Sequence, residues 1–267
     1  MRIRRLGWAG VEIESQGTRL AIDPLATLGF FEQFWGPEAE RDRLVQLEAG
    51  SLDGVLLTHF HRDHADPEAI AAAAGTDGVV AGPPRIRFVT PQQQYSVAPQ
   101  EDALSELGVE RLALSAGESL QLGELTATAC HSADGVGGNQ VAWVGSDGEA
   151  SVLHCGDTLW HGMWWELAAE HGSPDLVCLP ANGVEVSFPF NQPYVGQAAD
   201  MNPEQAVDAA YALGAGRLMP IHFNGTYSHP EIYRPTDNVT ARLEQAAASR
   251  GVDLAFPEIG SWLAVVE

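Results

Sequence analysis

The sequence predicts one α+β domain in which two strand-rich halves are each closed by helices. Three observations support this class. Short apolar segments separated by turn residues such as Gly, Pro and Asp recur in both halves and are typical of strands. Helix-like segments, two of them with Pro near the first turn, follow these strands. No stretch has the composition of a disordered linker, so residues 1–267 are expected to form a single domain.

The predicted strands begin with an N-terminal meander at residues 3–6, 11–14 and 19–22, which has Gly in its turns. A buried strand at 54–57 and a strand at 78–81 follow it. The second strand-rich half comprises residues 111–114, 119–122, 125–131, 141–144 and 151–155. Three further strands are expected at 176–179, 217–221 and 262–266.

Helices are predicted at residues 38–49, 67–74, 100–107, 202–213 and 238–250. Pro67 and Pro203 stand near the helix starts, where Pro is tolerated because the missing N–H would have no partner in the helix. Asn202 is the predicted N-cap of the fourth helix. The segments 82–100 and 182–201 are expected to be loop-rich, and a loop as long as the second is usually functional or mobile.

The chain is strongly acidic, with a net charge of −22 at pH 7, and all 14 of its basic residues are Arg. Nucleic acids and anionic membranes require a basic surface, so neither is expected as a partner. The N-terminus lacks the apolar core of a signal peptide and no apolar run has the length of a membrane span, so a cytoplasmic protein is expected. Cys130, Cys155 and Cys178 lie in apolar segments and are expected to be buried free thiols.

An aromatic segment at residues 28–35 allows two interpretations. Its Phe and Trp side chains can pack as a loop or short helix on the body of the domain. Alternatively, they form a hydrophobic lip over a site, or a contact between the subunits of a homo-oligomer. The sequence leaves these interpretations open.

The stretch Thr58–His64, of sequence THFHRDH, holds four strong metal ligands directly after a predicted buried strand. His59 and His61 are two residues apart, so on an extended backbone their side chains leave the chain on the same face. Asp63 and His64 follow where the chain turns, so their side chains can point toward a second metal centre nearby. Imidazole suits zinc, iron or manganese, and a carboxylate suits the harder ions of that set. A polar surface loop, the alternative, rarely places three His and an Asp within six residues.

Three further residues of ligand type stand at the ends of predicted strands. His131 ends the strand at 125–131, Asp157 follows the strand at 151–155, and His222 follows the strand at 217–221. Open α/β sheets place their chemistry at the carboxyl ends of strands. Each residue alone also fits a structural role, either as a satisfied His or as a turn-capping Asp. Together with the first cluster they favour a metal site.

These motifs carry a resemblance to a known family. His59-x-His61-x-Asp63-His64, His131, Gly156-Asp157-Thr158 and Pro220-Ile221-His222 occur in the order typical of the metallo-β-lactamase superfamily, which the chain resembles over nearly its whole length. The stretches Gly7–Gly10, Ile22–Pro24 and Met201–Ala206 further resemble the branch around ascorbate-6-phosphate lactonase. The resemblance implies a four-layer αββα sandwich with the metal site at the edge of the two facing sheets.

The resemblance also implies which residues hold which ion. The first ion would be held by three imidazoles, those of His59, His61 and His131. The second ion would have as its ligands Asp63, His64 and His222. Asp157 would bridge the two ions, and Asp23 would orient the ligands from behind. The expected cofactor is a pair of divalent metal ions, zinc first, with manganese or iron as alternatives.

The function expected from such a centre is hydrolysis. Two divalent ions about 3.5–4 Å apart share a water whose pKa falls from 15.7 to roughly 7, and the resulting metal-bound hydroxide attacks a small ester, lactone or phosphoester. Asp157 and Asp63 are the predicted catalytic residues: the first sets the separation of the ions and the second can take a proton. His and carboxylate ligands serve iron as well, so an iron-dependent oxygenase or redox enzyme is the alternative. A binding protein with a relict site is not favoured, because no ligand position is missing.

Recognition of a small-molecule substrate is assigned to loops. The candidate segments are 28–35, 133–139, 182–200 and 224–234. The residues near the metal motifs that are predicted to contact substrate are His161, Asn182, Tyr227 and His229. Each of them fits a surface or packing role equally well. Arg234 is one of the few cations that can meet an anionic group.

Overall fold

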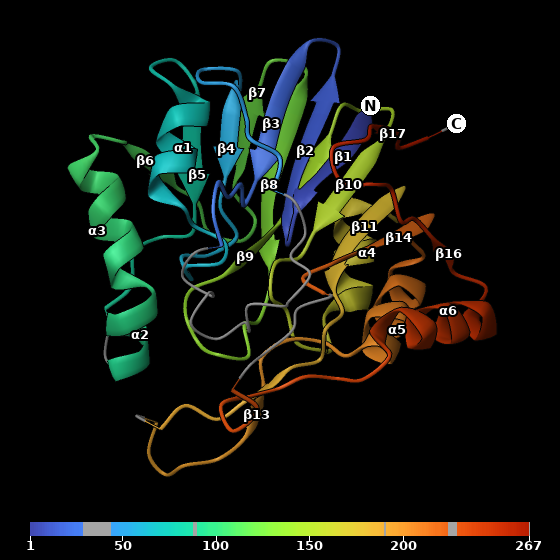
Figure 1. Cartoon of the computed structure of the whole chain (residues 1–267). Coiled ribbons are helices and arrows are strands. Elements are labelled where there is room, and N and C mark those ends of the chain that lie inside the picture. Colours follow the sequence, from blue (N-terminus) through green and yellow to red (C-terminus); the bar gives the residue numbers. More distant parts are fainter. Residues whose placement is uncertain (29–43, 88–89, 190, 224–228, 267) are drawn as a thin grey trace.

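The computed structural model describes residues 1–28, 44–87, 90–189, 191–223 and 229–266. Two sheets of seven strands face each other, and helices cover both outer faces (Figure 1). The predicted four-layer αββα sandwich is therefore confirmed. It forms because most central strands are apolar on both faces, and each sheet needs a partner layer on either side.

The first sheet has the strand order β17-β1-β2-β3-β4-β5-β6. It is antiparallel from β17 to β3 and parallel from β3 to β6. Its strands are Arg2–Gly7 (β1), Gly10–Ser15 (β2), Thr18–Ile22 (β3), Gly54–Leu56 (β4), Val79–Gly82 (β5), Arg111–Ala113 (β6) and Leu263–Ala264 (β17).

The second sheet has the order β16-β14-β11-β10-β9-β8-β7. The pairs from β16 to β10 are parallel and those from β10 to β7 are antiparallel. Its strands are Ser119–Leu122 (β7), Leu125–His131 (β8), Val141–Ser146 (β9), Ser151–His154 (β10), Leu176–Pro180 (β11), Arg217–Ile221 (β14) and Asp253–Leu254 (β16). Because β8, β10, β11 and β14 run in the same direction, the loops at their carboxyl ends share one edge of this sheet.

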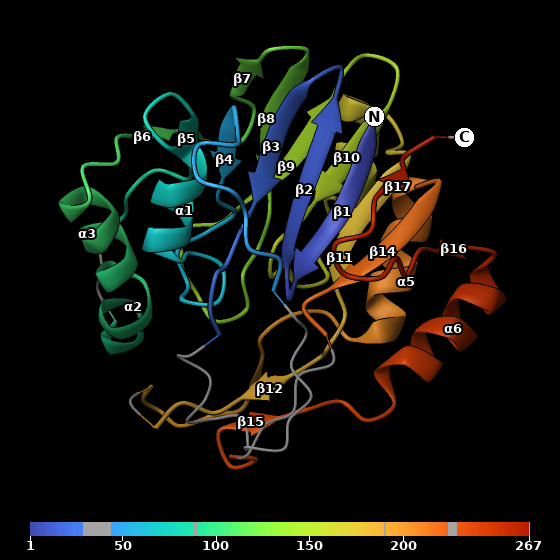
Figure 2. The ribbon, with the colours of Figure 1, turned by 45° about the horizontal axis from the view of Figure 1, so that its top comes forward.

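Helices lie on the outer side of each main sheet (Figure 1). Those beside the first sheet are Pro67–Ala74 (α1), Pro91–Ser96 (α2) and Ala98–Glu106 (α3). Those beside the second sheet are Trp164–His171 (α4), Pro203–Leu213 (α5) and Val239–Arg250 (α6). A small third sheet pairs Glu185–Val186 (β12) with Gln197–Ala198 (β13) and Tyr233–Arg234 (β15), and Figure 2 shows β12 and β15 below the two main sheets.

The main core lies between the two sheets, and strand β8 shows how the sequence builds it. Leu125, Ala127 and Ala129 alternate along β8 and belong to the core between the sheets, whereas Cys130 packs with the helices outside. Trp143 crosses the interface: it is fully buried, and its Nε1 donates at 3.0 Å to the carbonyl of Leu57, which directly follows β4 of the other sheet. The sandwich is thereby fixed close to the residues that lead into the candidate site.

Several predicted elements differ from the structure. The predicted helix at 38–49 lies outside the described residues as far as 43, and residues 44–49 are not helical. Segment 82–100 was predicted to be loop-rich, but it contains α2, because Pro91 is a helix start here and Thr90 and Gln93 form a capping box. Helix α4 was missed, and the predicted loop 182–201 contains β12 and β13. Most of the aromatic segment 28–35 lies outside the described residues.

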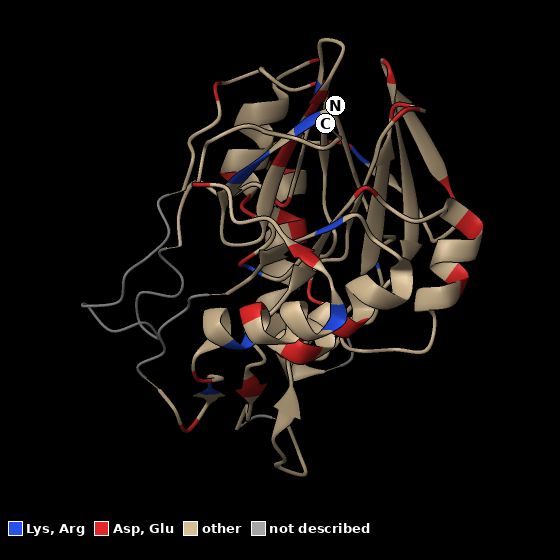
Figure 3. Ribbon diagram, turned by 90° about the vertical axis from the view of Figure 1, so that its right-hand side faces the viewer, with Lys and Arg blue, Asp and Glu red and all other residues tan. Residues whose placement is uncertain are grey.

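Acidic residues are spread over strands, helices and loops, with fewer Arg positions between them (Figure 3). Some of the Arg join neighbouring elements: Arg242 and Arg250 of α6 pair with Glu204 and Asp208 of α5. Such exposed pairs contribute little to stability. Within the described ranges, no helix combines the length and the apolar character that a bilayer crossing requires.

Candidate metal centre

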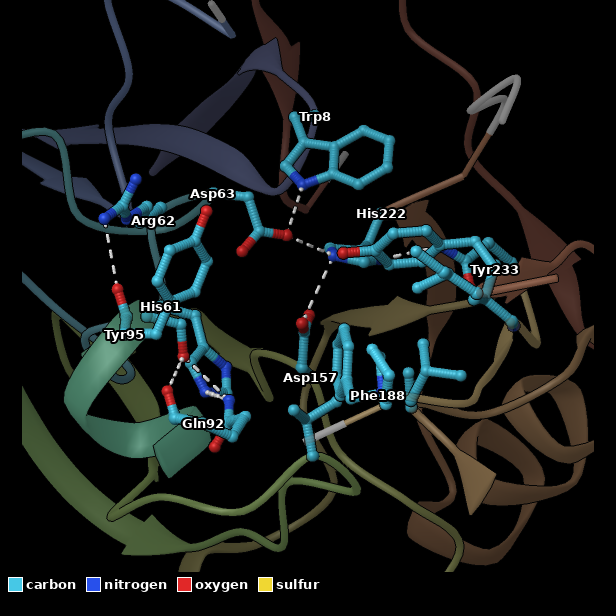
Figure 4. A pocket seen from close by; sticks show the side chains of 18 residues that line it. Trp8, His61, Arg62, Asp63, Gln92, Tyr95, Asp157, Phe188, His222 and Tyr233 are labelled. Carbon is cyan, nitrogen blue, oxygen red and sulfur yellow. Dashed lines mark hydrogen bonds and ion pairs between the residues drawn. The ribbon is translucent and has the colours of Figure 1, made fainter. Parts of the chain in front are cut away.

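Side chains of ligand type converge where the carboxyl ends of strands from both sheets meet. Those ends belong to β3, β4, β8, β10, β11 and β14. Figure 4 shows part of this centre, with Asp63, Asp157 and His222 pointing toward one another. The convergence brings together residues far apart in the sequence, such as Asp63 and His222, which are in contact although 159 positions separate them.

One group at the centre consists of Asp63, His64, Asp157 and His222, whose ligand atoms all lie within 4.8 Å of one another. His222 Nε2 is 2.9 Å from Asp63 Oδ2 and 3.2 Å from Asp157 Oδ2. His64 Nε2 is 3.0 Å from Asp157 Oδ1. The structure therefore brings together the three residues predicted for the second ion and the predicted bridging carboxylate.

A second group consists of His59, His61 and Asp134, again with ligand atoms within 4.8 Å. His61 Nδ1 is 3.2 Å from Asp134 Oδ2. His59 Nε2 is 4.0 Å from Asp157 Oδ2, so Asp157 stands between the two groups.

The predicted third imidazole of the first site, His131, joins neither group. Its ring centroid lies 5.3 Å from that of His161, beside α4. The chain after β8 instead pairs Asp134 with Thr158 in a β-bridge, which places the Asp134 carboxylate next to His61. Among the described residues, Asp134 therefore lies in the place beside His59 and His61 where His131 is predicted. Asp134 is not among the predicted ligands, because its signal in the sequence is only an acidic side chain in the Gly-rich loop 133–139.

The atoms that face the centre fit a bound cation. His59 Nε2, His64 Nε2, Asp134 Oδ2 and Asp157 Oδ1 are buried and have no hydrogen-bond partner among the described residues. His64 Nε2 and Asp157 Oδ1 are nevertheless 3.0 Å apart, so they are close without being aligned as donor and acceptor. Buried polar atoms nearly always form hydrogen bonds. Imidazole and carboxylate atoms that instead converge on one point suit divalent zinc, manganese or iron.

Polar contacts at the ring nitrogens that face away from the centre hold the imidazole ligands in place. Asp23 Oδ2 is 2.7 Å from His64 Nδ1, and the Asp23 carboxylate also accepts from the backbone N–H and the hydroxyl of Thr58 at 2.8 and 2.6 Å. Thr58 Oγ1 lies 2.9 Å from His59 Nδ1. Contacts at Nδ1 of both imidazoles leave their Nε2 atoms for a metal. Asp23 thus stands where an orienting residue is expected.

His222 is held in the same way by Asn182, which follows β11, and by Asp200, which follows β13. Asp200 Oδ2 and Asn182 Nδ2 each lie 2.9 Å from His222 Nδ1. Asn182 also lines the cavity described below, so of the three predicted substrate residues that the structure describes it is the one placed at the centre. Asp200 was missed because it lies in a segment predicted to be a loop, and nothing in the sequence shows that this segment returns to His222.

The backbone is bent at three residues of the centre. Trp8, Asp23 and His222 have positive φ angles of 53°, 50° and 50°. Such angles are uncommon outside Gly and cost on the order of 1–3 kcal/mol each. Hydrogen bonds maintain them: the N–H of Asp23 donates to the carbonyl of Leu56 at 3.0 Å, and that of His222 to the carbonyl of Trp8 at 3.2 Å. Bends concentrated in one place indicate that the backbone is shaped to direct these side chains inward.

The charges of the centre are strongly coupled. Burial disfavours the charged forms of His64 and His222, but nearby carboxylates, above all Asp157, raise the pKa of both well above its usual value. Burial acts to raise the pKa of Asp157, but His222 and His64 lower it well below its usual value. Burial and the neighbouring imidazoles lower the pKa of His59. In the absence of an ion, protons on His64 and His222 therefore balance the carboxylates, and a metal has to displace them.

A cavity of about 220 Å³ opens onto the centre (Figure 4). His61, Asp63, Asp157 and His222 line it on the side of the metal ligands. Gln92 and Tyr95 of α2 lie on one side, and Phe188 and Tyr233 lie on the other. Burial raises the pKa of the Tyr233 phenol, which therefore stays protonated at neutral pH. The remaining lining is mainly aliphatic and includes Val136, Val184, Val186 and Ile232.

The other predicted substrate residues do not line this cavity as far as it is described. His161 stacks on Trp164 with ring centroids 3.9 Å apart, and burial together with His131 lowers its pKa to about 4. His229 is exposed and lies beside an acidic neighbour. Tyr227 lies outside the described residues. Arg234, the candidate cation, pairs with a Glu of β12.

Comparisons with known proteins agree with this architecture. A family model described as the β-lactamase superfamily domain matches residues 18–223. A UPF0173 metal-dependent hydrolase of Methanopyrus kandleri is 26% identical over 251 residues, which cover 92% of each chain. The names of the relatives do not single out the ascorbate-6-phosphate lactonase branch, which stays a prediction.

Two solved structures illustrate the shared fold. Igni18, a metallo hydrolase from Ignicoccus hospitalis, has a TM-score of 0.63 and 18% identity, with 98% of this chain and 97% of that one covered. CmlA, a diiron β-hydroxylase from Streptomyces venezuelae, has a TM-score of 0.69 and 19% identity, with 95% and 52% covered. Because the family model covers most of the chain and the fold agrees, the protein belongs to the metallo-β-lactamase superfamily.

Proposed function

We propose that this protein is a dinuclear metal hydrolase of a small ester, lactone or phosphoester. By its family and its relatives it is a metal-dependent hydrolase, and the proposal adds the number of ions and the class of substrate. The observation that carries it is the position of Asp157. One carboxylate oxygen lies 3.0 Å from His64 Nε2, and the other lies 3.2 Å from His222 Nε2 and 4.0 Å from His59 Nε2. A carboxylate between two sets of imidazoles is suited to bridge two ions.

A bound pair of divalent ions supplies an ionised water at neutral pH and polarises the oxygen of the substrate. The protein's own side chains supply the rest. Burial opposes ionisation of Asp63, but His64 and His222 lower its pKa, so without an ion its carboxylate is charged at neutral pH. Trp8 Nε1 donates to Asp63 Oδ2 at 3.1 Å, which fixes the direction of this carboxylate.

The lining of the cavity favours a substrate with an apolar part. Val184, Val186, Phe188 and Tyr233 form a largely apolar wall opposite the metal ligands, and β12 and β15 carry two of them. The described lining has one Arg and no Lys, and this Arg62 stacks on Tyr95 with its guanidinium 4.8 Å from the ring centroid. Among the three substrate types, the wall therefore supports an uncharged ester or lactone more than a phosphoester.

An iron-dependent oxygenase is the second candidate, because one observation favours it. Two imidazoles and one carboxylate, those of His59, His61 and Asp134, form the type of ligand set found in non-haem iron oxygenases. The fold is compatible with such chemistry, since the similar CmlA structure is that of a diiron β-hydroxylase. Metal content and oxygen uptake separate the two candidates.

The test uses full-length protein stripped of metal and reloaded with Zn²⁺, Mn²⁺ or Fe²⁺. Each form is assayed on aryl esters, lactones and phosphodiesters, with oxygen consumption recorded in parallel. We expect hydrolysis of an ester or lactone without oxygen uptake. An iron-loaded, oxygen-consuming protein without hydrolytic activity would contradict the hydrolase proposal.

Two variants test the assignment of the ligands. We expect His61→Ala and Asp157→Ala to lose metal and hydrolytic activity while the far-UV circular dichroism of the fold persists. His229→Ala removes an exposed imidazole away from the described lining of the cavity, and it serves as the matched control. If His61→Ala and Asp157→Ala both retained two full metal equivalents, the ligand assignment would be wrong.

A further inference from the structure

We propose that Asp134, and not His131, completes the first metal site, so that two imidazoles and a terminal carboxylate hold this ion. The inference rests on the proposed function only in requiring an ion beside His59 and His61. It does not depend on which substrate is cleaved.

The two carboxylate oxygens of Asp134 have different surroundings. Oδ1 accepts the backbone N–H of Val136 at 2.7 Å, which anchors the carboxylate to its own loop. Oδ2 is buried, has no hydrogen-bond partner among the described residues, and lies 3.2 Å from His61 Nδ1. The Asp134 side chain is only 1% exposed, so water does not readily replace the missing partner. A cation between Oδ2 and Nδ1 would satisfy both atoms.

The ring of His61 is held from its other side. The amide of Gln92 on α2 lies 3.1 Å from His61 Nε2. A terminal amide can present either its oxygen or its nitrogen, because the two are exchanged by a flip. With an ion on Nδ1, Nε2 carries the proton and donates to the amide oxygen. Helix α2 then orients His61 as the orienting partners of the other imidazoles do.

The backbone fixes Asp134 at the centre. The N–H of Leu159 donates to the carbonyl of Ala133 at 2.7 Å, and Asp134 pairs with Thr158, so this loop is tied to the chain just after Asp157. The loop then folds over the site: a Cβ added at Gly138 would lie 3.5 Å from Asp134 Oδ2 and 3.9 Å from His61 Nε2.

The His131 side chain, in contrast, packs away from His59 and His61. Its ring lies against His161, which in turn stacks on Trp164 of α4. No ligand atom of His131 belongs to any candidate metal group among the described residues. Bringing His131 to the ion would require the end of β8 to leave its pairing with Val141 or its side chain to leave the contact with His161.

Replacing an imidazole by a carboxylate changes which ion the site prefers. The first ion would have two carboxylate ligands, Asp134 and Asp157, in addition to His59 and His61. Carboxylates suit harder ions such as manganese, whereas a set richer in imidazole suits zinc. The first site should therefore discriminate less strongly for Zn²⁺ over Mn²⁺ than a site with three imidazoles.

The experiment measures the metal content of full-length wild type and of Asp134→Ala, Asp134→Asn and His131→Ala. Each protein is stripped, dialysed against Zn²⁺ or Mn²⁺, and analysed by elemental mass spectrometry, with circular dichroism to check the fold. We expect both Asp134 variants to lose one metal equivalent or to bind it about 100-fold more weakly. His131→Ala should keep the wild-type content.

Asp134→Asn controls for a collapse of the loop, because its amide oxygen can still accept the N–H of Val136. A second readout is Asp134→His, which should recover the lost ion and raise the ratio of Zn²⁺ to Mn²⁺ affinity above that of wild type. A structural role alone would not produce this change in selectivity.

Loss of an equivalent in His131→Ala, or full retention in the folded Asp134 variants, overturns the inference. A wild type that takes up both ions but hydrolyses none of the substrates refutes the proposed function alone, since metal content still decides the role of Asp134. A wild type that takes up no ion refutes both.

Discussion

Three imidazoles of the centre are oriented by a polar partner at the ring nitrogen that faces away from the centre. Asp23 contacts Nδ1 of His64, Asp200 contacts Nδ1 of His222, and Thr58 contacts Nδ1 of His59. Such partners set which ring nitrogen is free for a metal and raise its basicity. We therefore expect metal affinity to respond to residues that would never touch the ion.

Asp23→Asn tests this expectation. An Asn at this fully buried position offers one acceptor oxygen where the carboxylate now meets both Thr58 and His64 Nδ1, so His64 loses part of its orientation. We expect the second ion to bind about 10–100-fold more weakly, as measured by chelator competition. Asp53→Asn is the control, because Asp53 accepts the N–H of Arg19 at an exposed position. Equal losses in both variants would show that Asp23 has no specific role.

A site residue can be predicted from the sequence when it belongs to a short contiguous motif or directly follows a recognisable strand. Asp63 and His64 are encoded in one contiguous motif, and Asp157 and His222 follow apolar strands that are easily recognised. Asp134 could not be chosen over His131, because the choice depends on how the Gly-rich loop 133–139 pairs with Thr158. That pairing is a tertiary contact without a sequence signature.

At the scale of elements, the centre depends on the sharp turns that follow the strands. Gly156, after β10, has a φ of +58°, and a Cβ there would lie 2.7 Å from Thr58 Oγ1. The turn after β10 therefore packs directly against the residue that leads into the first ligand motif. A side chain at Gly156 would push Asp157 and Thr58 apart.

Gly156→Ala is expected to lower the free energy of unfolding by about 1–3 kcal/mol through the positive φ, with a further loss from the contact with Thr58. The control is Gly17→Ala in the β2–β3 turn, which has a φ of +87° and nothing within 4 Å of the added Cβ. Urea denaturation of both variants separates the loss of unfolding free energy caused by the contact with Thr58 from the loss caused by the positive φ. If Gly17→Ala cost as much as Gly156→Ala, close packing at the centre would not be responsible.

The predictability of the elements follows from where their stability originates. Central strands such as β4 and β11 are continuous apolar runs, so they can be predicted from the sequence. Helix α4 has eight residues and depends on burying Trp164 and Leu167 against the second sheet. The two-residue strands β12, β13 and β15 exist only through their mutual pairing. Such elements are stabilised by tertiary packing, so periodicity does not reveal them.

At the scale of the whole molecule, protons and metal ions compete for the same buried centre. When no ion is bound, the raised pKa values of His64 and His222 make their ion pairs stabilising. This contribution is fully present below the unfolded-state value of about 6.5 and is lost as the pH rises through the folded-state pKa values. A metal needs both imidazoles neutral, so its binding strengthens over the same range of rising pH.

We therefore expect the increase in melting temperature on adding Mn²⁺ to grow as the pH is raised from about 6 to about 9. Differential scanning calorimetry of stripped and loaded protein at each pH provides the measurement. His229→Ala, which removes a surface imidazole, should keep the same dependence. A metal-induced shift that stayed constant or fell with rising pH would mean that protons and metal do not compete at His64 and His222.

Anomalous diffraction from a crystal loaded with Mn²⁺ or Zn²⁺ tests the central claim most directly. The claim is that loops from both sheets hold two ions with Asp157 between them. Data collected at the absorption edge should show two peaks about 3.5–4 Å apart, one on each side of the Asp157 carboxylate. A single peak, or two peaks of which neither contacts Asp157, would contradict it.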